Sequence, residues 1–312
     1  MNITMLHDLD TGFLAATLKP AFEALGHKCT VMQTIKTYLE TDTPHIDHLM
    51  SEMEDKDIHA LKDVFKETDM FILRSITDNS LKAIGIIPFI TPHNTIWRVH
   101  GSEIRLRNVP YSLRTWRINW HNKEPIIVGP RDPSLRPLYR GNVVTQIERP
   151  CAFDTFPRKK QHETGYVLHS PTRPDKKGTQ ELLDAFDDKG SIPLYIMSGA
   201  SRKQVLKAKA GASYFIDYLG GWVAGPYGMN TVEAWYYRIP VFSLCKPADM
   251  VVCPELSSMI HTFKDTNDLK HIIRAYTPDK KQLNNARKYA LHTHDPMRIA
   301  QQYVNLGKEL AE

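Results

Sequence analysis

Cysteine is scarce in this sequence, and the few cysteines that occur are widely spaced. The 312 residues contain four, at Cys29, Cys151, Cys245 and Cys253, and no two of them form a C-x-x-C pair. A disulfide framework and a cysteine-based zinc site are therefore excluded. No apolar run approaches the roughly 20 residues of a membrane-spanning helix, and the opening MNITMLHDLD lacks the basic flank and apolar core of a signal peptide. These absences predict a reduced, cytoplasmic protein without structural metal.

The rest of the composition is that of a globular protein, with 42% hydrophobic and 24% charged residues. A chain of this length predicts two domains or one large one. The net charge of +5 conceals a basic middle segment. Residues 1–97 carry eight Lys and Arg against fourteen Asp and Glu, whereas residues 98–149 carry ten against four, a net of +6. This basic stretch, residues 98–149, suggests a surface that faces negative charge.

Short apolar runs alternate with helical patterns along the whole chain, which predicts α/β units with parallel sheets. A polar segment at 154–164 without periodicity indicates a linker, so we expect two doubly wound Rossmann-like domains facing across a cleft. The expected domains are 1–157, joined by a last helix at 297–312 that crosses back, and 158–296. The expected strands are 2–7, 29–34, 70–74, 87–91, 95–100, 125–129, 165–169, 193–198, 213–217 and 240–243.

The strongest motif is GPYGMNTVEAWYYRIPVF at 225–242, which reads as a glycine loop, a helix and a buried strand. Gly225 and Gly228 allow backbone N–H groups to approach a ligand, and the following helix offers its positive end to a phosphate. Glu233 lies about one turn into that helix, where a carboxylate can accept both hydroxyls of a ribose. An ordinary tight turn with a solvated glutamate explains the same pattern equally well.

Two further motifs also run from a strand into a loop. In HSPTRPDKKGTQELLDAF (169–186), Arg173 and Lys177 precede a helix that opens at Gly178, which suits a diphosphate clamp but also a solvated basic loop. In VHGSEIR (99–105), a strand delivers His100 to its carboxyl end, where open α/β sheets hold their reactive groups. Asp10-Thr11-Gly12 and Asp8-Leu9-Asp10 are rejected as a protease triplet and a metal site, because neither has the further acids that the chemistry needs.

Taken together, the three motifs resemble those of the family 4 glycosyltransferases of the GT-B fold, over most of the chain. The matching segments are His100-Gly101-Ser102, the H-x-P-x-x-R-x-x-K-G-T type from His169 to Thr179, and the G-x-Y-G loop with E-A and P-V from Gly225 to Val241. Two departures are visible: Arg173 comes one residue early, and Gly225 stands where many members carry the first of two glutamates.

The resemblance implies transfer of a sugar from a nucleotide-diphosphate sugar, here a UDP-sugar such as UDP-glucose, with retention of configuration and without metal or other cofactor. It implies His100, Arg173 and Lys177 as catalytic residues. The implied donor-binding set is Thr11, Gly12, Arg173, Lys177, Gly178, Tyr227, Gly228, Met229, Asn230 and Glu233.

The sequence indicates the acceptor less clearly than the donor. The basic stretch interleaves arginines with aromatic residues, which suits a phosphate-bearing polymer whose extruded base can stack on an aromatic ring. We therefore slightly favour a hydroxymethylated base in DNA, with Arg105, Arg107, Arg114 and Arg117 as acceptor-binding residues. The same stretch would suit an anionic membrane surface or a lipid-linked glycan of cell-surface polysaccharide synthesis, or be a solvated surface. A nucleotide-sugar epimerase of the same architecture is a further alternative.

Overall fold

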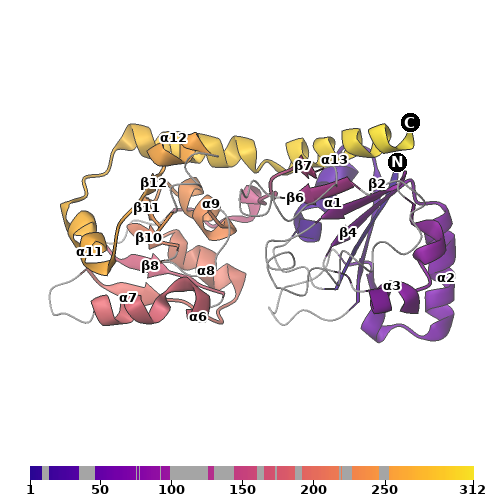
Figure 1. The fold of residues 1–312 in the computed structure, drawn as a ribbon, viewed down its shortest axis with the longest axis horizontal. Coiled ribbons are helices and arrows are strands. Elements are labelled where there is room, and N and C mark those ends of the chain that lie inside the picture. Colours follow the sequence, from indigo (N-terminus) through magenta and orange to yellow (C-terminus); the bar gives the residue numbers. More distant parts are fainter. Residues whose placement is uncertain are drawn as a thin grey trace. The chain divides into compact units, whose positions relative to one another are not determined.

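A computed structural model describes most of this chain as two α/β units (Figure 1). The described residues are 1–8, 14–34, 46–74, 76, 78–91, 93–98, 126–129, 144–159, 165–172, 174–186, 192–217, 219, 227–245 and 253–312. Unit 1 comprises Met1–Pro150 and Pro296–Glu312, and unit 2 comprises Cys151–Asp295. The boundary lies before the expected linker, because Phe153 and Phe156 stack on aromatic residues of unit 2.

Unit 1 is a seven-stranded parallel sheet in the order β3-β2-β1-β4-β5-β6-β7. Its strands are β1 (Asn2–His7), β2 (Lys28–Gln33), β3 (His48–Leu49), β4 (Met70–Arg74), β5 (Thr95–Arg98), β6 (Ile126–Gly129) and β7 (Val144–Gln146). Its helices are α1 (Leu14–Ala24), α2 (Asp55–Lys66), α3 (Asp78–Ala83) and α13 (Pro296–Ala311), with 3₁₀ turns η1 (Met50–Glu52) and η2 (Ile87–Phe89).

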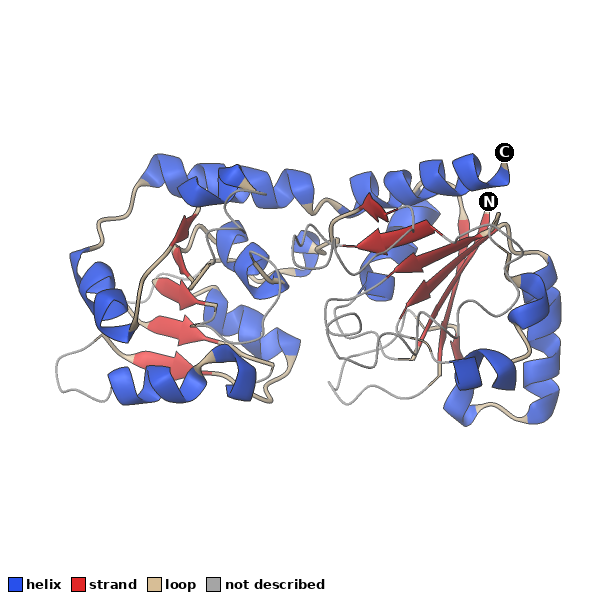
Figure 2. Cartoon of the chain, in the orientation of Figure 1, coloured by secondary structure: helices blue, strands red, loops and turns tan. Residues whose placement is uncertain are grey.

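Helices cover both faces of this sheet (Figure 2). Alternate strand residues such as Met5 and Ile72 pack with Phe22 of α1 and Tyr303 of α13, whereas the intervening Leu6 packs with residues of α2 and α3. This alternation follows from the two-residue period of a strand. The last helix therefore belongs to the first unit.

Unit 2 is a five-stranded parallel sheet in the order β12-β11-β10-β8-β9. Its strands are β8 (Val167–His169), β9 (Leu194–Ile196), β10 (Tyr214–Ile216), β11 (Val241–Phe242) and β12 (Ile260–His261). Its helices are α6 (Pro174–Lys177), α7 (Thr179–Ala185), α8 (Arg202–Lys209), α9 (Met229–Tyr236), α11 (Thr266–Ala275) and α12 (Lys280–Thr293), with 3₁₀ turns η4 (Phe153–Thr155) and η5 (Pro254–Ser258).

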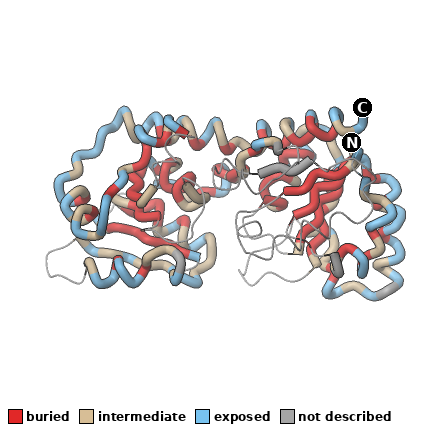
Figure 3. The backbone as a smooth tube through the Cα atoms, viewed as in Figure 1, coloured by how far each residue is buried: buried red, intermediate tan, exposed pale blue. Residues whose placement is uncertain are grey.

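The sheet of unit 2 is also buried between two helical layers (Figure 3). Leu168 and Phe215 pack with residues of α8, α9 and α12, and Val167 and Ile216 pack with residues of α7 and α11. The polar segments that follow the strands at their carboxyl ends are thereby held on a rigid support. This is the edge of the sheet at which the second sequence motif lies.

Local structure differs from the sequence prediction at residues 87–91 and in three short strands, β3, β7 and β12, that the sequence analysis does not predict. Residues 87–91 are not a strand: Ile87–Phe89 form a 3₁₀ turn with Pro88 in its first positions, because proline cannot donate to a strand ladder but suits the start of a helical turn. Helix α1 contains Pro20 within its span. Within the described residues, no helix combines the length and the apolar character that a membrane crossing requires.

Candidate functional site

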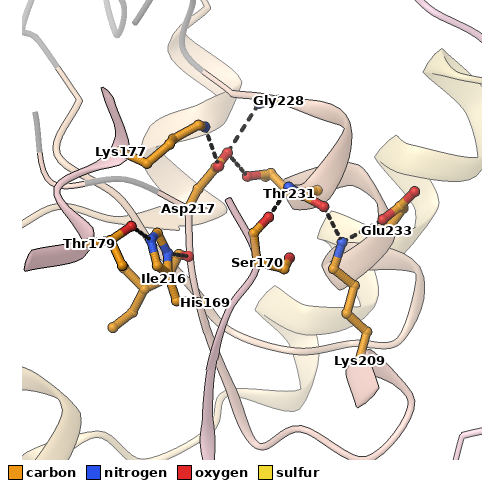
Figure 4. A network of polar contacts seen from close by, with 11 residues as sticks. His169, Ser170, Lys177, Thr179, Lys209, Ile216, Asp217, Gly228, Thr231 and Glu233 are labelled. Atoms are coloured by element: carbon orange, nitrogen blue, oxygen red, sulfur yellow. Dashed lines mark hydrogen bonds and ion pairs between the residues drawn. The ribbon is translucent and has the colours of Figure 1, made fainter. Parts of the chain in front are cut away.

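The carboxyl end of β8 is fastened to its surroundings by a buried histidine (Figure 4). His169 Nδ1 lies 2.9 Å from the carbonyl oxygen of Ile216 on β10, and Nε2 lies 3.0 Å from Thr179 Oγ1 on α7. Burial lowers the pKa of His169, so the ring is neutral at pH 7. Nδ1–H then donates to the carbonyl and Nε2 accepts the hydroxyl proton. The ring therefore positions the loop that begins after β8.

Gly178 lies between α6 and α7 in a conformation that requires glycine. Its φ is +70°, and a Cβ added there would lie 2.8 Å from Leu219 Cβ. Both constraints exclude a side chain, since the left-handed region and this close approach each disfavour one. The sequence motif K-G-T thus has a steric basis, and the turn carries Lys177 to the carboxyl edge of the sheet.

A buried carboxylate, Asp217, joins this turn to the glycine loop (Figure 4). Lys177 Nζ donates to Asp217 Oδ1 at 2.7 Å. The other oxygen, Oδ2, accepts from Gly228 N at 3.2 Å and from Thr231 Oγ1 at 2.7 Å. Lys177, Gly228 and Thr231 come from two different motifs, so Asp217 is the point at which the motifs meet.

The charge on Asp217 is maintained despite its burial. Desolvation acts to raise the pKa of this carboxyl, but the Lys177 ammonium and the hydrogen bonds from Thr231 and Gly228 outweigh it and hold the pKa below its ordinary value. A carboxylate with three donors is favoured in its ionised form. The Lys177 side chain is 15% exposed, so its charge reaches the surface beside the N-terminus of α9.

Glu233 is also buried, and it pairs with two cations of α8. Lys209 Nζ contacts Glu233 Oε2, and Arg202 Nη2 lies 3.3 Å from Oε1. Lys209 is fully buried and also donates to Asn230 Oδ1 at 2.5 Å. Burial lowers the pKa of Lys209, whereas Glu233 acts to raise it. The glutamate is therefore held in one orientation by α8, whose own start is fixed by a capping box between Ser201 and Gln204.

The remaining residues of the glycine-loop motif are anchored within unit 2. Tyr227 Oη lies 3.2 Å from Tyr289 Oη and 3.1 Å from His294 Nε2, so its side chain ties the loop to α12 and the turn that follows it. Asn230 Nδ2 donates to the carbonyl oxygen of Ser170 at 2.8 Å. Gly228 precedes α9, and Met229 is its first residue. The backbone of Tyr227, Gly228 and Met229 is thus fixed at the helix N-terminus.

The structure brings together part of the expected donor site. Lys177, Gly178, Gly228 and Thr231 converge on Asp217, while Asn230 and Glu233 form a second cluster one turn along α9. The sequence reasoning missed Asp217, Lys209 and Arg202. An acid at the end of the run SYFID was the available signal for Asp217, whereas nothing in the local sequence distinguishes Lys209. Outside the described residues lie Thr11, Gly12, His100, Arg105, Arg107, Arg114, Arg117, Arg173 and Gly225.

Unit 1 contains a separate cavity of about 410 Å³. It lies at the carboxyl ends of β1 and β2, where Thr34 Oγ1 donates to Asp8 Oδ1 at 2.5 Å. Its lining residues are Asp8, Thr34, Met50, Ser51, Ile58, Ser80, Ala83 and Ile84. Asp8 therefore contributes to a mixed polar and apolar wall. Among the described residues, no group of three or more His, Cys, Asp and Glu side chains is placed to hold a metal ion.

The solved structures to which this chain is similar include glycosyltransferases and an epimerase. The catalytic domain of starch synthase IV from Arabidopsis thaliana, bound to ADP and acarbose, aligns over 99% of each chain with a TM-score of 0.60 and 10% identity. A UDP-N-acetylglucosamine 2-epimerase aligns over 97% of this chain and 94% of its own, with a TM-score of 0.55 and 12% identity. A spinosyn rhamnosyltransferase complexed with thymidine diphosphate aligns over 97% and 100%, with a TM-score of 0.53 and 9% identity.

The sequence itself matches no family model and no curated protein. At these identities the structural likeness establishes the fold alone. The chain has the GT-B fold, two Rossmann-like α/β domains with parallel sheets, as the sequence predicts.

The charge on Asp217 predicts a pH dependence of stability. Because its pKa is lowered on folding, the stabilisation is fully present above the unfolded value of roughly 3.9 and is lost as the pH falls through the folded value. Asp217→Asn keeps the acceptor oxygen and removes the charge. We expect the variant to be less stable by about 1–3 kcal/mol at pH 7, with the difference narrowing below pH 4. Urea unfolding from pH 3 to pH 7 measures this, and a difference that stays constant over that range would contradict it.

Proposed function

We propose that this protein is a glycosyltransferase that moves a sugar from a nucleotide-diphosphate sugar, with UDP-sugars favoured, to a hydroxyl acceptor. The observation that carries the proposal is the meeting of Lys177 and the N-terminus of α9 on one carboxylate. A lysine ammonium and the positive end of a helix are two groups that bind phosphate, and here they lie side by side at the carboxyl edge of the sheet. The GT-B fold and the motif resemblance support the same assignment.

In this proposal Lys177 acts on the leaving diphosphate. Negative charge builds up on the diphosphate as the bond to the sugar breaks, and a fixed cation stabilises that charge more than it stabilises the intact donor. Asp217 fixes the ammonium, which has three N–H donors and can serve more than one acceptor. Arg173 is proposed as the second cation of the clamp. Gly178 and the backbone of residues 227–229 are proposed to lie against the diphosphate, since glycine allows the backbone to approach it closely.

Glu233 is proposed to bind the donor ribose. Its two oxygens already accept from Lys209 and Arg202, which hold the carboxylate in a fixed orientation. A carboxylate has about four acceptor positions, so two such contacts are compatible with further hydrogen bonds from ribose hydroxyls. Asn230 also accepts a hydrogen bond from Lys209, and we propose that it lies beside Glu233 in the donor site. Thr11, Gly12 and His100 are proposed to approach the diphosphate and sugar from unit 1.

Retention without a metal ion is proposed from the family resemblance. The buried cysteines are poor nucleophiles in the folded protein, since burial raises the pKa of Cys29 to about 12 and that of Cys151 further still. A mechanism in which the acceptor attacks from the face that the diphosphate leaves needs no covalent nucleophile. Under this mechanism the departing diphosphate accepts the proton of the attacking hydroxyl.

An epimerase is the second candidate, favoured by the structural likeness to a UDP-N-acetylglucosamine 2-epimerase. An epimerase would release a sugar of altered configuration, whereas a retaining transferase returns it unchanged. The fold accommodates both reactions. Product analysis decides between them.

The decisive experiment is incubation of the purified protein with UDP-, GDP- and ADP-sugars, with proton NMR of the released sugar. We expect slow release of UDP and of a sugar with its original configuration. Lys177→Met should lower kcat by roughly 10²-fold with a smaller change in KM, and Lys207→Met on the outer part of α8 serves as a matched control. If no nucleotide sugar is consumed, or the sugar is epimerised, the transferase proposal is wrong.

The role of Glu233 is testable by calorimetry with UDP and with 2′-deoxy-UDP. Glu233→Gln should weaken UDP binding by about 1–3 kcal/mol, and this loss should be smaller for 2′-deoxy-UDP, which lacks one ribose hydroxyl. The glutamine variant is preferred because it keeps one side-chain oxygen that can accept from the fully buried Lys209. Glu233→Ala would leave that ammonium without any acceptor at this position, at a cost of about 3–5 kcal/mol in folding stability. If the substitution weakens binding of UDP and of 2′-deoxy-UDP equally, Glu233 does not bind the ribose 2′-hydroxyl and the assignment is wrong.

For the acceptor, we propose a hydroxymethylated base in DNA, on the basis of the +6 charge and the aromatic residues of the basic stretch. The protein should then bind duplex DNA without a nucleotide sugar, with a log–log salt slope of about −0.9 for each phosphate neutralised. Exchanging Arg114 and Arg117 for Glu should flatten that slope and leave donor hydrolysis intact. Binding to anionic vesicles in place of DNA would favour the lipid-linked or cell-surface glycan alternative, and binding to neither would indicate a small neutral acceptor.

A further inference from the structure

Unit 1 carries a row of buried basic residues at the carboxyl edge of its sheet. His7, Arg74 and Arg98 end the neighbouring strands β1, β4 and β5, and they are paired in register across the ladder. Their exposed fractions are 2%, 3% and 1%. Residues paired across a parallel ladder point to the same face of the sheet, which here is the face covered by α1 and α13. Two arginines and a histidine are therefore neighbours on one buried face of the sheet, where His7 Nε2 lies 3.1 Å from Gln33 Oε1.

Arg98 is the residue of this row for which the described part of the chain supplies no carboxylate. Its Nη1 donates to the carbonyl oxygen of Ile147 and, at 3.3 Å, to Tyr303 Oη on α13. Among the described residues, Nε and Nη2 have no hydrogen-bond partner although both atoms are buried, and no carboxylate forms an ion pair with the group. Asp8, which follows β1, is oriented by Thr34 toward the cavity lined by Met50 and Ile84.

A buried guanidinium without a counter-charge is costly, and a buried polar group without a partner calls for an explanation. The Nε and Nη2 edge of arginine presents two parallel N–H donors, which match two oxygens of a phosphate or a carboxylate. Arg74 ends the adjacent strand in register with Arg98, so the same face of the sheet carries a second positive charge. Two positive charges on one face favour a doubly charged anion over a singly charged one.

We propose that Arg98 binds a phosphate group at the carboxyl edge of the unit 1 sheet. The proposal needs only the fold of unit 1 and is independent of the donor chemistry assigned to unit 2. Arg98 is also the first residue of the basic stretch. Within that stretch, the structure describes the side chains of Arg98 and of residues 145–149. The phosphate can belong to a nucleic-acid backbone or to a small phosphorylated molecule, since the oxygen chemistry is the same.

The test is hydrogen exchange of the full-length chain, measured by mass spectrometry in phosphate and in chloride at equal ionic strength. All proteins carry Lys177→Met, so that phosphate bound in unit 2 does not contribute. We expect at least threefold slower exchange with phosphate in the segments 93–98 and 299–306, and no such protection with acetate. Arg98→Met should abolish the protection and Arg98→Lys should reduce it, because lysine keeps the charge but lacks the two parallel donors.

Thermal unfolding distinguishes a phosphate-binding role of Arg98 from a purely structural one. A buried charge without a counter-charge costs folding free energy, so an apolar side chain of similar size in its place should not lower stability. Arg98→Met should therefore unfold at the same or a higher temperature in chloride, and it should lose the increase that phosphate gives the parent protein. A lower unfolding temperature in chloride together with an unchanged response to phosphate would assign Arg98 a structural role and overturn the proposal.

The two sources of phosphate are separated by repeating the exchange measurement with a short DNA duplex. If the duplex protects at a lower concentration, counted per phosphate group, than inorganic phosphate does, the ligand is a nucleic-acid backbone. If inorganic phosphate protects at the lower concentration, the ligand is a small phosphorylated molecule. Equal protection by acetate, or none by any anion in the parent protein, would overturn the phosphate site. These outcomes are independent of donor hydrolysis, so failure of the transferase proposal would be recognised separately.

Discussion

Asp217 brings a negative charge into the interior of unit 2, and the surrounding segments are arranged to compensate it. Its two oxygens take donors from Lys177, Gly228 and Thr231, which belong to the turn after β8 and to the start of α9. A buried carboxylate without these partners would be strongly unfavourable. The turn and the glycine loop therefore hold one fixed position relative to each other, and the surface that we assign to the donor diphosphate is a consequence of that constraint.

A second buried ion pair, between Glu233 of α9 and Lys209 of α8, fixes the next turn of α9. Glu233 is paired with Lys209, which has no exposed surface and also donates to Asn230. Such pairs contribute little net stability, because desolvation offsets their attraction, but removing one partner leaves an isolated charge. Their effect is to determine orientation: α8 fixes the glutamate and Asp217 fixes the lysine of the preceding turn. The catalytic proposal depends on this rigidity more than on the number of charges present.

Unit 1 shows the opposite situation. Arg98 is as deeply buried as Asp217, yet two of its nitrogens lack partners among the described residues. The two units differ in this respect: protein groups surround the buried carboxylate of unit 2, whereas the described residues of unit 1 leave two nitrogens of the buried guanidinium without acceptors. The GT-B fold does not specify which ligand completes such a site, since transferases and an epimerase share it. Function is therefore assigned from individual side chains.

The sequence by itself determined the alternation of strands and helices, the two-unit organisation and the glycine-based turns, because these depend on periodicity and on residues with restricted or permissive backbones. Lys177, Gly178, Gly228 and Glu233 were accessible for the same reason, as members of contiguous motifs. Residues 87–91 were misjudged because a short apolar run containing proline suits either a strand or a 3₁₀ turn. Asp217, Lys209 and Arg98 became visible only in the tertiary structure, since their partners lie 40, 24 and 205 residues away in the chain and the cost of a buried charge depends on what the fold places beside it.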